Sequence, residues 1–415
     1  MRKILLVFLL SIPFVYSYGQ DEDEEKKFGI KFTGFVKADV FYDTRQTIAA
    51  RQGHFLLYPA KEVLDKNGDD INAKGNFNIL TIQTRLKGVI TGPDALGAKT
   101  SGVIEGEFFG HTNSDLNEFR LRHAFVKLDW TKSTLLVGQT WHPMFITTCY
   151  PGTVSFNTGV PFLPFTRNPL VQYQFRAGPL NFYATAYAQL DFASTGPQGM
   201  TPIYLRNAGV PGLNAKIEFH EKNDDTGFEF LLGGSFNYKM ITPQLSTGEG
   251  YKTTETANSY AANIYTKIVT KPLTIKLMGT YGQDLYDFLM LGGYAVSDTI
   301  NKEKGFVEYT PFEAMAAWAD IHTNGKKVQV GLYAAYSQNM GTVSAIGGPM
   351  YARGTDIDHV FRVAPRLIMN FNKFRIAPEV EYTAAAYGNT MPDGTVTDAV
   401  QVGNLRFLLG VYYFF

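Results

Sequence analysis

The chain has 415 residues, with 38 basic and 38 acidic side chains, 14% aromatic residues, 40 glycines and one cysteine. This charge balance favours neither nucleic acid nor an anionic lipid surface as a partner, and one cysteine excludes an intramolecular disulfide framework. After residue 19 no apolar run is long enough for a transmembrane helix. Many aromatic residues and glycines with only 18% charged residues are typical of strands and turns.

Residues 1–19 have the parts of a secretory signal peptide. Arg2 and Lys3 form a basic start, 4–15 is an apolar stretch, and small residues precede the expected cleavage site. The apolar stretch is too short to span a bilayer as an anchor. We therefore expect Sec-type export and a short acidic periplasmic tail at 20–30.

The rest of the chain, 31–415, is a series of segments in which apolar and polar residues alternate, as they do in tilted membrane strands. Short and long links follow one another in turn, which a soluble β-sandwich does not require. This rhythm predicts an all-β, antiparallel up-and-down transmembrane barrel with short periplasmic turns, long extracellular loops and both ends in the periplasm. We count sixteen segments, at 31–44, 77–91, 101–111, 118–130, 134–141, 170–178, 180–192, 212–220, 227–241, 256–270, 273–288, 309–322, 327–341, 357–372, 374–389 and 400–415.

The two faces of the segments differ in the way that a barrel in lipid requires. A charge facing hydrocarbon costs about 2–4 kcal/mol at the midplane, so the charged face must line a wet interior. The chain stops at Phe415, and this ending resembles the C-terminal signal of outer-membrane barrels. We therefore expect a multi-pass protein of the bacterial outer membrane. In the last segment the face expected to contact lipid consists of Leu405, Phe407, Leu409, Val411, Tyr413 and Phe415.

The link 142–169 is the third connection on the long-loop side and is rich in proline and aromatic residues. Such a composition suits a stiff, packed loop, and the third extracellular loop of sixteen-stranded porins narrows the pore. The alternative is an ordinary external loop that contacts a neighbouring subunit. Cys149 is expected to be a buried free thiol. As residues of a constriction we select Tyr150, Phe156, Phe162, Phe165 and Arg167.

Charges on the inward face form two groups that are expected to line a pore. A basic wall facing acidic residues would orient ionic solutes and favour anions. The alternative is a set of arginine–carboxylate pairs that hold the wall together. The basic group is Arg85, Lys87, Arg120, Arg122, Arg176, Arg362, Arg366, Arg375 and Arg406, and the acidic group is Asp39, Asp43, Glu105, Glu107, Glu379 and Glu381.

No motif indicates an enzyme, a metal centre or a cofactor. The run Asp65 to Asp70 has oxygen ligands at alternate positions, but it lacks the distal glutamate of a calcium loop, so we interpret it as an Asn-Gly turn. The histidines have no paired metal spacing, and nucleophile and phosphate-binding motifs are missing. We expect no catalysis, no metal and no cofactor.

Several stretches together resemble the DcaP-like porins, in the form found in Bacteroidota. They are GFVKADVFYDTRQ (34–46), HFLLYP (54–59), IQTRLKGVITGPDALGAKTSGVIEGEFFG (82–110), FRLRHAFVKLDW (119–130) and LLVGQTWHPMF (135–145). The resemblance implies a trimeric sixteen-stranded channel for small, often anionic solutes such as dicarboxylates. The chain departs from the family in lacking a long N-terminal coiled-coil extension, so a coiled-coil trimerisation stalk is not expected.

Three functional classes remain for such a barrel. The first is a porin for passive diffusion of small hydrophilic solutes, with some preference for anions. The second is a structural or binding barrel whose external loops contact glycans or partner proteins, and a lumen closed by the 142–169 loop would favour it. The third is an outer-membrane lipase, which needs a nucleophile and a histidine within hydrogen-bond reach. A TonB-dependent transporter is disfavoured, because its 22 strands and plug do not fit this chain.

Overall fold

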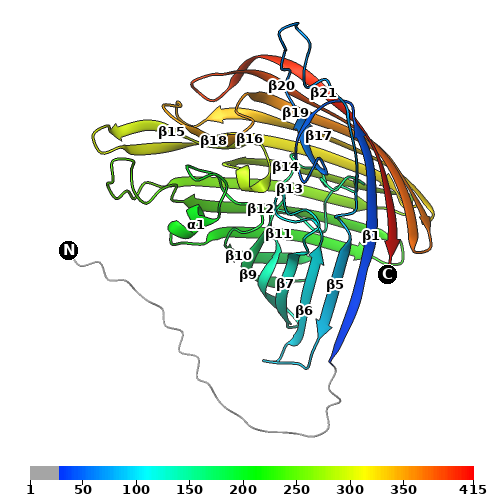
Figure 1. Cartoon of the computed structure of the whole chain (residues 1–415). Coiled ribbons are helices and arrows are strands. Elements are labelled where there is room, and N and C mark those ends of the chain that lie inside the picture. The colour runs from blue at the N-terminus through cyan, green and yellow to red at the C-terminus, as the bar shows by residue number, and fades with distance from the viewer. Residues whose placement is uncertain (1–27) are drawn as a thin grey trace, which may run out of the picture.

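The computed structural model describes residues 28–415, which form one closed antiparallel β-barrel (Figure 1). The predicted signal peptide at 1–19 and residues 20–27 of the predicted tail lie outside the described residues. Within residues 28–415 no helix is long and apolar enough to cross a membrane. The all-β class and the sixteen-stranded barrel are confirmed.

Sixteen barrel strands follow one another around the wall, and β4 with β5 counts as one of them, since both pair with β1. Every predicted segment overlaps one of these strands. The strands are β1 (Gly29–Asp43), β4 (Asn76–Leu80) with β5 (Arg85–Thr91), β6 (Lys99–Glu107), β7 (Arg120–Asp129), β8 (Ser133–Trp141), β9 (Arg167–Ala177), β10 (Leu180–Tyr187), β11 (Gly212–Asn223), β12 (Phe228–Ile241), β13 (Ala257–Val269), β14 (Leu273–Gln283), β16 (Phe306–Thr323), β17 (Val328–Thr342), β19 (Ile357–Phe371), β20 (Phe374–Thr390) and β21 (Val396–Phe414).

The first and last strands close the barrel. β1 pairs with β21 from Phe35↔Phe414 to Asp43↔Arg406, and its other edge pairs with β4 and β5. Closure leaves no strand edge in the hydrocarbon, where unpaired backbone groups cost several kcal/mol each. The terminal aromatic segment is thus part of the seam itself.

The long loops contain short elements that the alternating pattern did not reveal. A hairpin of β2 (Thr47–Ala50) and β3 (Phe55–Pro59) lies in the first loop, and α1 (Ile203–Asn207) lies in the fourth. β15 (Gly292–Asn301) pairs with the upper part of β16 and with β18 (Met350–Arg353), so three strands extend beyond the barrel rim. The turn η1 (Tyr286–Phe288) precedes β15. These pieces were missed because they are short and lie inside irregular sequence.

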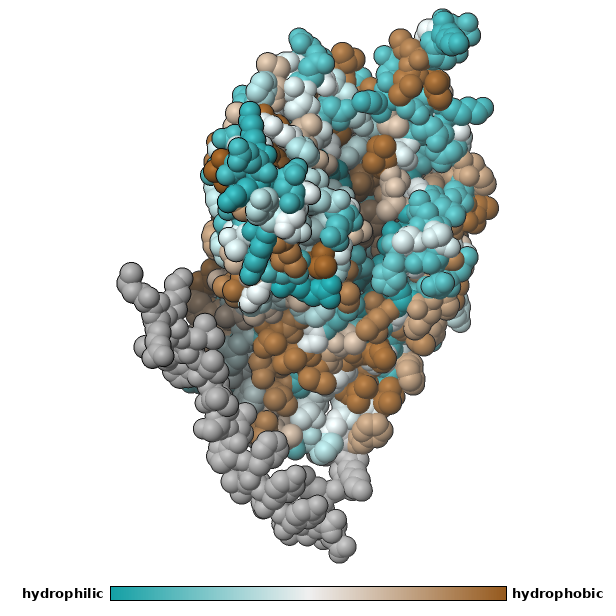
Figure 2. Space-filling view, turned by 60° about the vertical axis from the view of Figure 1, so that its left-hand side comes forward, coloured by the Kyte–Doolittle hydropathy of each residue, from teal (hydrophilic) through white to brown (hydrophobic). Residues whose placement is uncertain are grey.

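The outer wall is apolar along the middle of the strands. Alternate residues there expose large apolar side chains, and Figure 2 shows apolar surface on the wall below the hydrophilic loops. Because side chains alternate across a strand, the charged partners of these residues point inward. Among the exposed residues are Val36, Leu86, Val126, Ile264, Leu277, Leu332 and Leu409.

The barrel also has an apolar core on its inside. Side chains of the loops at 55–58, 144–165 and 285–291 pack there against inward-facing residues of the wall, such as Tyr265 and Trp318. Aromatic side chains bury large apolar areas, which favours folding of these loops into the lumen. The loops therefore occupy much of the interior.

Substituting Ile264, which is 65% exposed near the middle of β13, with Arg is expected to lower the free energy of unfolding by about 2–4 kcal/mol. Leu273→Arg is the matched control, because Leu273 faces outward at the end of β14, where the cost falls to about 0–1 kcal/mol. Denaturant unfolding of both variants in lipid vesicles measures the difference. Equal costs would contradict the lipid-facing assignment of Ile264.

Candidate functional site

The loop between β8 and β9, residues 142–166, folds into the barrel and is bound to the inner wall. The carboxylate of Glu379 on β20 accepts hydrogen bonds from the backbone N–H groups of Val154, at 2.7 Å, and Ser155, at 2.9 Å. The side-chain amide of Asn157 donates to Glu381 at 3.0 Å. These bonds satisfy buried backbone and side-chain groups of an irregular loop, which otherwise cost free energy.

The five side chains predicted to form a constriction occupy three different environments. Phe156, Phe162 and Phe165 are buried in the interior apolar core, whereas Tyr150 remains 41% exposed. Arg167 is the first residue of β9, so it belongs to the wall at the end of the loop. The three phenylalanines fix the loop, and Tyr150 is the member of the set that faces open space.

The first and second extracellular loops both pack against these phenylalanines. The ring of Phe55, in the first loop, lies 5.4 Å from that of Phe156, and the ring of Phe109, in the second loop after β6, lies 4.1 Å from it. Arg362 of β19 joins the first loop to the 142–166 loop, because its guanidinium donates to Val160 O at 2.7 Å and Leu57 O at 2.9 Å. A buried arginine with carbonyl acceptors and a carboxylate, Glu381 at 3.2 Å, thus ties both loops to the wall.

A compact network of charges covers β5, β6 and β7. Glu107 contacts Arg85 at 3.1 Å, Arg120 at 2.7 Å and Arg122 at 2.7 Å, while Glu105 contacts Arg122 at 2.7 Å. Each carboxylate lies beside its arginines on neighbouring strands. On β5, β6 and β7 the basic and the acidic side chains therefore alternate on one wall. They do not face each other across the lumen there, as a basic wall opposite an acidic one would. Ion pairs this deeply buried need such neighbours to offset their desolvation.

The structure adds charged residues to these networks that were not selected from the sequence. Asp191, just after β10, contacts Arg120 at 2.9 Å and Arg167 at 2.6 Å. Lys37 contacts Asp39 at 3.0 Å, and Asp320 contacts Arg366 at 2.7 Å. Lys37 and Asp320 could have been selected from the sequence, because they lie on the inward-facing side of their strands. Asp191 could not, because it lies in a loop whose sequence has no periodicity.

The remaining selected charges also lie inside the barrel. Arg406 contacts Asp43 at 2.6 Å and donates to Gly53 O, which attaches the first loop to the seam. Arg176 contacts Asp129 at 2.9 Å beside the short turn at 130–132. The role of all these residues in lining a pore stays a prediction.

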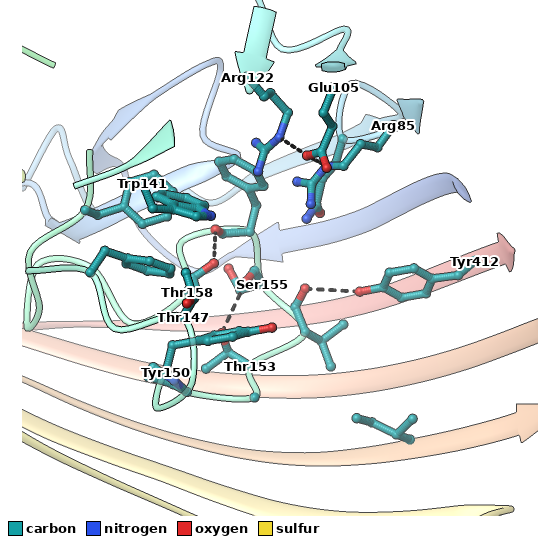
Figure 3. A pocket seen from close by; sticks show the side chains of 18 of the residues that line it. Arg85, Glu105, Arg122, Trp141, Thr147, Tyr150, Thr153, Ser155, Thr158 and Tyr412 are labelled. Atoms are coloured by element: carbon teal, nitrogen blue, oxygen red, sulfur yellow. Dashed lines mark hydrogen bonds and ion pairs between the residues drawn. The ribbon is translucent and has the colours of Figure 1, made fainter. Parts of the chain in front are cut away.

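A cavity of about 610 Å³ lies under the loop and reaches the short-turn end of the barrel. Figure 3 shows Arg85, Glu105 and Arg122 from the wall around it, together with Tyr150, Thr153 and Ser155 from the loop. The short-turn end is marked by Gln329, the second residue of β17, and by Arg375, the second residue of β20. The volume of this cavity is typical of a site for a small solute.

The cavity has an excess of positive charge. Five cations line it, Arg85, Lys87, Arg122, Arg366 and Arg375, against the single carboxylate of Glu105. Glu107 and Asp320 lie behind this lining and pair with the arginines. Among residues 28–415, no carboxylate lies within 4.0 Å of the charged groups of Lys87 or Arg375. Lys87 and Arg375 therefore account for the excess positive charge of the cavity lining.

Burial shifts the pKa values of several titratable groups in the loops. Burial raises the pKa of the Cys149 thiol to about 12, so the thiol stays protonated and unreactive at neutral pH. Burial lowers the pKa of His142 to about 3, and burial together with Arg120 lowers the pKa of Arg51 to about 10. Within the described residues, no group of three or more potential metal ligands occurs. The carboxylate of Asp65 accepts the N–H groups of Asn67 and Asp69 and thereby closes a turn.

Solved structures of outer-membrane channels share this architecture. The outer membrane channel DcaP of Acinetobacter baumannii superimposes with a TM-score of 0.65 at 18% identity, over 94% of this chain and 97% of that one. The chain has the porin barrel fold. An anion-selective porin from Comamonas acidovorans gives a TM-score of 0.55 at 10% identity, and OmpT of Vibrio cholerae gives 0.53 at 12%, each over 94% of this chain. The superposition covers 100% of the Comamonas acidovorans porin and 98% of OmpT.

No protein-family model and no curated protein matches the sequence. The superposition on the DcaP channel confirms, for the fold, the resemblance that the sequence predicted. A closed porin barrel with an apolar outer wall is an integral protein of the outer membrane.

Replacing Glu379 with Ala is expected to release the middle of the loop, because the N–H groups of Val154 and Ser155 lose their acceptor. The loss is about 1 kcal/mol or more, so amide hydrogen exchange over 152–158 speeds up by about fivefold or more. Mass spectrometry of the folded barrel measures this exchange.

Glu313→Ala is the matched control, since the carboxylate of Glu313, on β16, accepts a hydrogen bond from Gln283 of the neighbouring strand β14, at 2.9 Å. Exchange over 152–158 that stays at the wild-type rate in Glu379→Ala would show that the carboxylate does not hold the loop.

Proposed function

We propose that this protein is a channel for passive diffusion of small hydrophilic solutes across the outer membrane. The observation that carries the proposal is the water-accessible cavity inside a porin barrel, between the folded loop and the short-turn end. Within the described residues, no group of three or more His, Cys, Asp or Glu side chains could hold a metal ion. Solutes would move down their gradient without chemistry, and the loop would set the size limit.

Anions are the solutes that the cavity favours. Lys87 and Arg375 face it without a carboxylate within 4.0 Å among residues 28–415, so the local potential is positive. A wall of low dielectric concentrates that field and raises the local concentration of anions. The anion-selective porin from Comamonas acidovorans, which has the same fold, is consistent with this choice. Small dicarboxylates are solutes of this kind.

The packed interior favours a second candidate. Phe55, Phe156, Phe162 and Phe165 are almost completely buried where the first and third loops meet, so the passage beside them is narrow. A barrel closed at this level would act through its external loops by binding glycans or partner proteins. The ion conductance of the purified protein distinguishes the two candidates, because an open channel conducts ions and a closed barrel does not.

A homotrimer is part of the first proposal. The hairpin at 61–74 supports it, because Val63, Leu64 and Ile71 expose apolar side chains above the barrel rim. The ion pair between Arg45 and Asp70, at 2.6 Å, holds this hairpin in place. Apolar residues on a rigid projection are suited to contact with a neighbouring copy.

Purified protein in a planar lipid bilayer is expected to give discrete conductance steps, because on this proposal ions cross the barrel through the water-accessible cavity. Single-channel recording in KCl makes the measurement, and the Glu379→Ala variant should give larger steps through its released loop. A bilayer that contains folded protein but carries no steps would reject the channel and leave the second candidate.

Replacing Lys87 and Arg375 together with Gln is expected to reduce the anion-to-cation permeability ratio at least severalfold, because the two cations without ion pairs are removed. Reversal potentials across a KCl gradient give the ratio. The control removes equal charge from an exposed hairpin outside the barrel, by Lys302→Gln with Lys304→Gln. A ratio that falls equally in both variants, or in neither, would contradict the role of the cavity.

A further inference from the structure

Three consecutive turns on the short-turn side of the barrel, which faces the periplasm, carry only basic charge. They join β13 to β14, β16 to β17 and β19 to β20, and these six strands are neighbours in the wall. The basic residues of the three turns are Lys271, Lys326, Lys327 and Lys373. All four are exposed, and among residues 28–415 none has a carboxylate within 4.0 Å of its ammonium group. The turn between β11 and β12 differs, because it carries Asp224 and Asp225.

Two asparagines hold these turns next to each other. Asn324, between β16 and β17, donates from its backbone N–H to Pro272 O at 2.9 Å and from its side-chain amide to Thr270 O at 2.7 Å. Asn370 of β19 donates from its backbone N–H to Lys327 O at 2.8 Å. The backbone from which the lysines extend is therefore fixed, and the four ammonium groups belong to one strip of the periplasmic rim.

An apolar groove of about 670 Å³ lies in the outer wall above this strip. Its floor consists of small outward-facing residues that stand opposite each other on neighbouring strands, Gly279 with Ala317 and Ala319 with Ala334. Longer outward-facing side chains form its edges, and they include Ile264, Leu277, Tyr336 and Val363. Three of the four floor residues lie on β16 and β17, the strands that are joined by the turn with Lys326 and Lys327.

From these facts we propose that the groove and the basic turns below it form a binding site for an anionic phospholipid of the periplasmic leaflet. On this proposal an acyl chain lies in the groove, and the phosphate group pairs with the lysines of the turns. The site depends on the place of the barrel in the outer membrane and not on whether the channel conducts.

The height of the groove matches one leaflet of a bilayer. Gly279 lies six residues from Leu273, the first residue of β14 after the turn with Lys271, and this is about 20 Å along the strand. A strand tilt of about 45° reduces that length to a height of about 14 Å, and one leaflet has about 15 Å of hydrocarbon. Ala317 likewise lies six residues from Thr323, the last residue of β16. An acyl chain whose phosphate is at the turns therefore reaches the groove.

Charge complementarity favours an anionic lipid as the occupant. Each lysine near a membrane surface favours anionic lipid by about fivefold, and four of them lie on this strip without an ion pair among residues 28–415. The hairpin at 61–74, proposed above to contact a neighbouring copy, leads into β4. The strands β1, β21, β20 and β19 separate β4 from β17, so the groove lies outside that contact.

The headgroup is tested by native mass spectrometry of the folded, purified protein with phosphatidylglycerol or phosphatidylcholine of identical acyl chains. We expect the barrel to prefer phosphatidylglycerol by about tenfold or more, and Lys326→Gln with Lys327→Gln to reduce this preference by about fivefold or more. The matched control, Lys302→Gln with Lys304→Gln on the extracellular hairpin, should keep the wild-type preference. Equal affinity of the wild type for the two lipids, or an equal loss in both variants, would overturn the anionic site.

The groove is tested separately by Ala317→Leu, which fills its floor. Retention of both lipids should fall about threefold or more, because the acyl chain loses contact with the wall. Ala184→Leu changes an exposed, outward-facing alanine of β10 outside the groove and should leave retention unchanged. Unchanged retention in Ala317→Leu would overturn the acyl-chain site. If the wild type retains no lipid and Ala317→Leu changes the number of copies in the same spectra, the groove binds a second copy and the proposal is wrong.

Discussion

Closure of the backbone hydrogen-bond ladder is the constraint on which the rest of this structure depends. In hydrocarbon no water pairs with a free N–H or C=O group, so the first and last strands must meet. The pairing of β1 with β21, from Phe35 opposite Phe414 to Asp43 opposite Arg406, meets that requirement. The register of this pairing also matters, because a shift of one residue would turn the charges of one of the two strands toward lipid.

Inside the barrel, the charges of the wall serve as hydrogen-bond partners for irregular loops. Glu379 accepts two loop N–H groups, and Arg362 binds carbonyls of two different loops. A loop placed at membrane depth would otherwise leave polar backbone groups unpaired. Many of the inward charges therefore hold the loops, and Lys87 and Arg375 line the cavity without a carboxylate within 4.0 Å among residues 28–415.

The packing of the loops then decides which part of the lumen stays open. The aromatic cluster of Phe55, Phe109, Phe156 and Phe165 fills the side of the lumen where the first, second and third loops meet. Below it, the wall of β5, β6 and β7 and the loop enclose the basic cavity. The shape of the cavity is thus set by a small apolar core inside a barrel with a charged inner wall, and a periodic strand pattern does not reveal that core.

The sequence by itself determined the all-β class, the sixteen strands and their alternation of short and long links, because the side-chain parity that lipid requires recurs in all sixteen segments. It also predicted inward-facing charges and an infolded loop at 142–169, but it did not select Lys37, Asp191 or Asp320 for the charge networks. Only the tertiary structure decided which charges are paired: Glu107 with three arginines, Arg366 with Asp320, and Lys87 with no carboxylate within 4.0 Å among residues 28–415. Those partners come from strands and loops far apart in the chain. Their distances depend on register and loop packing, which single-residue patterns do not encode.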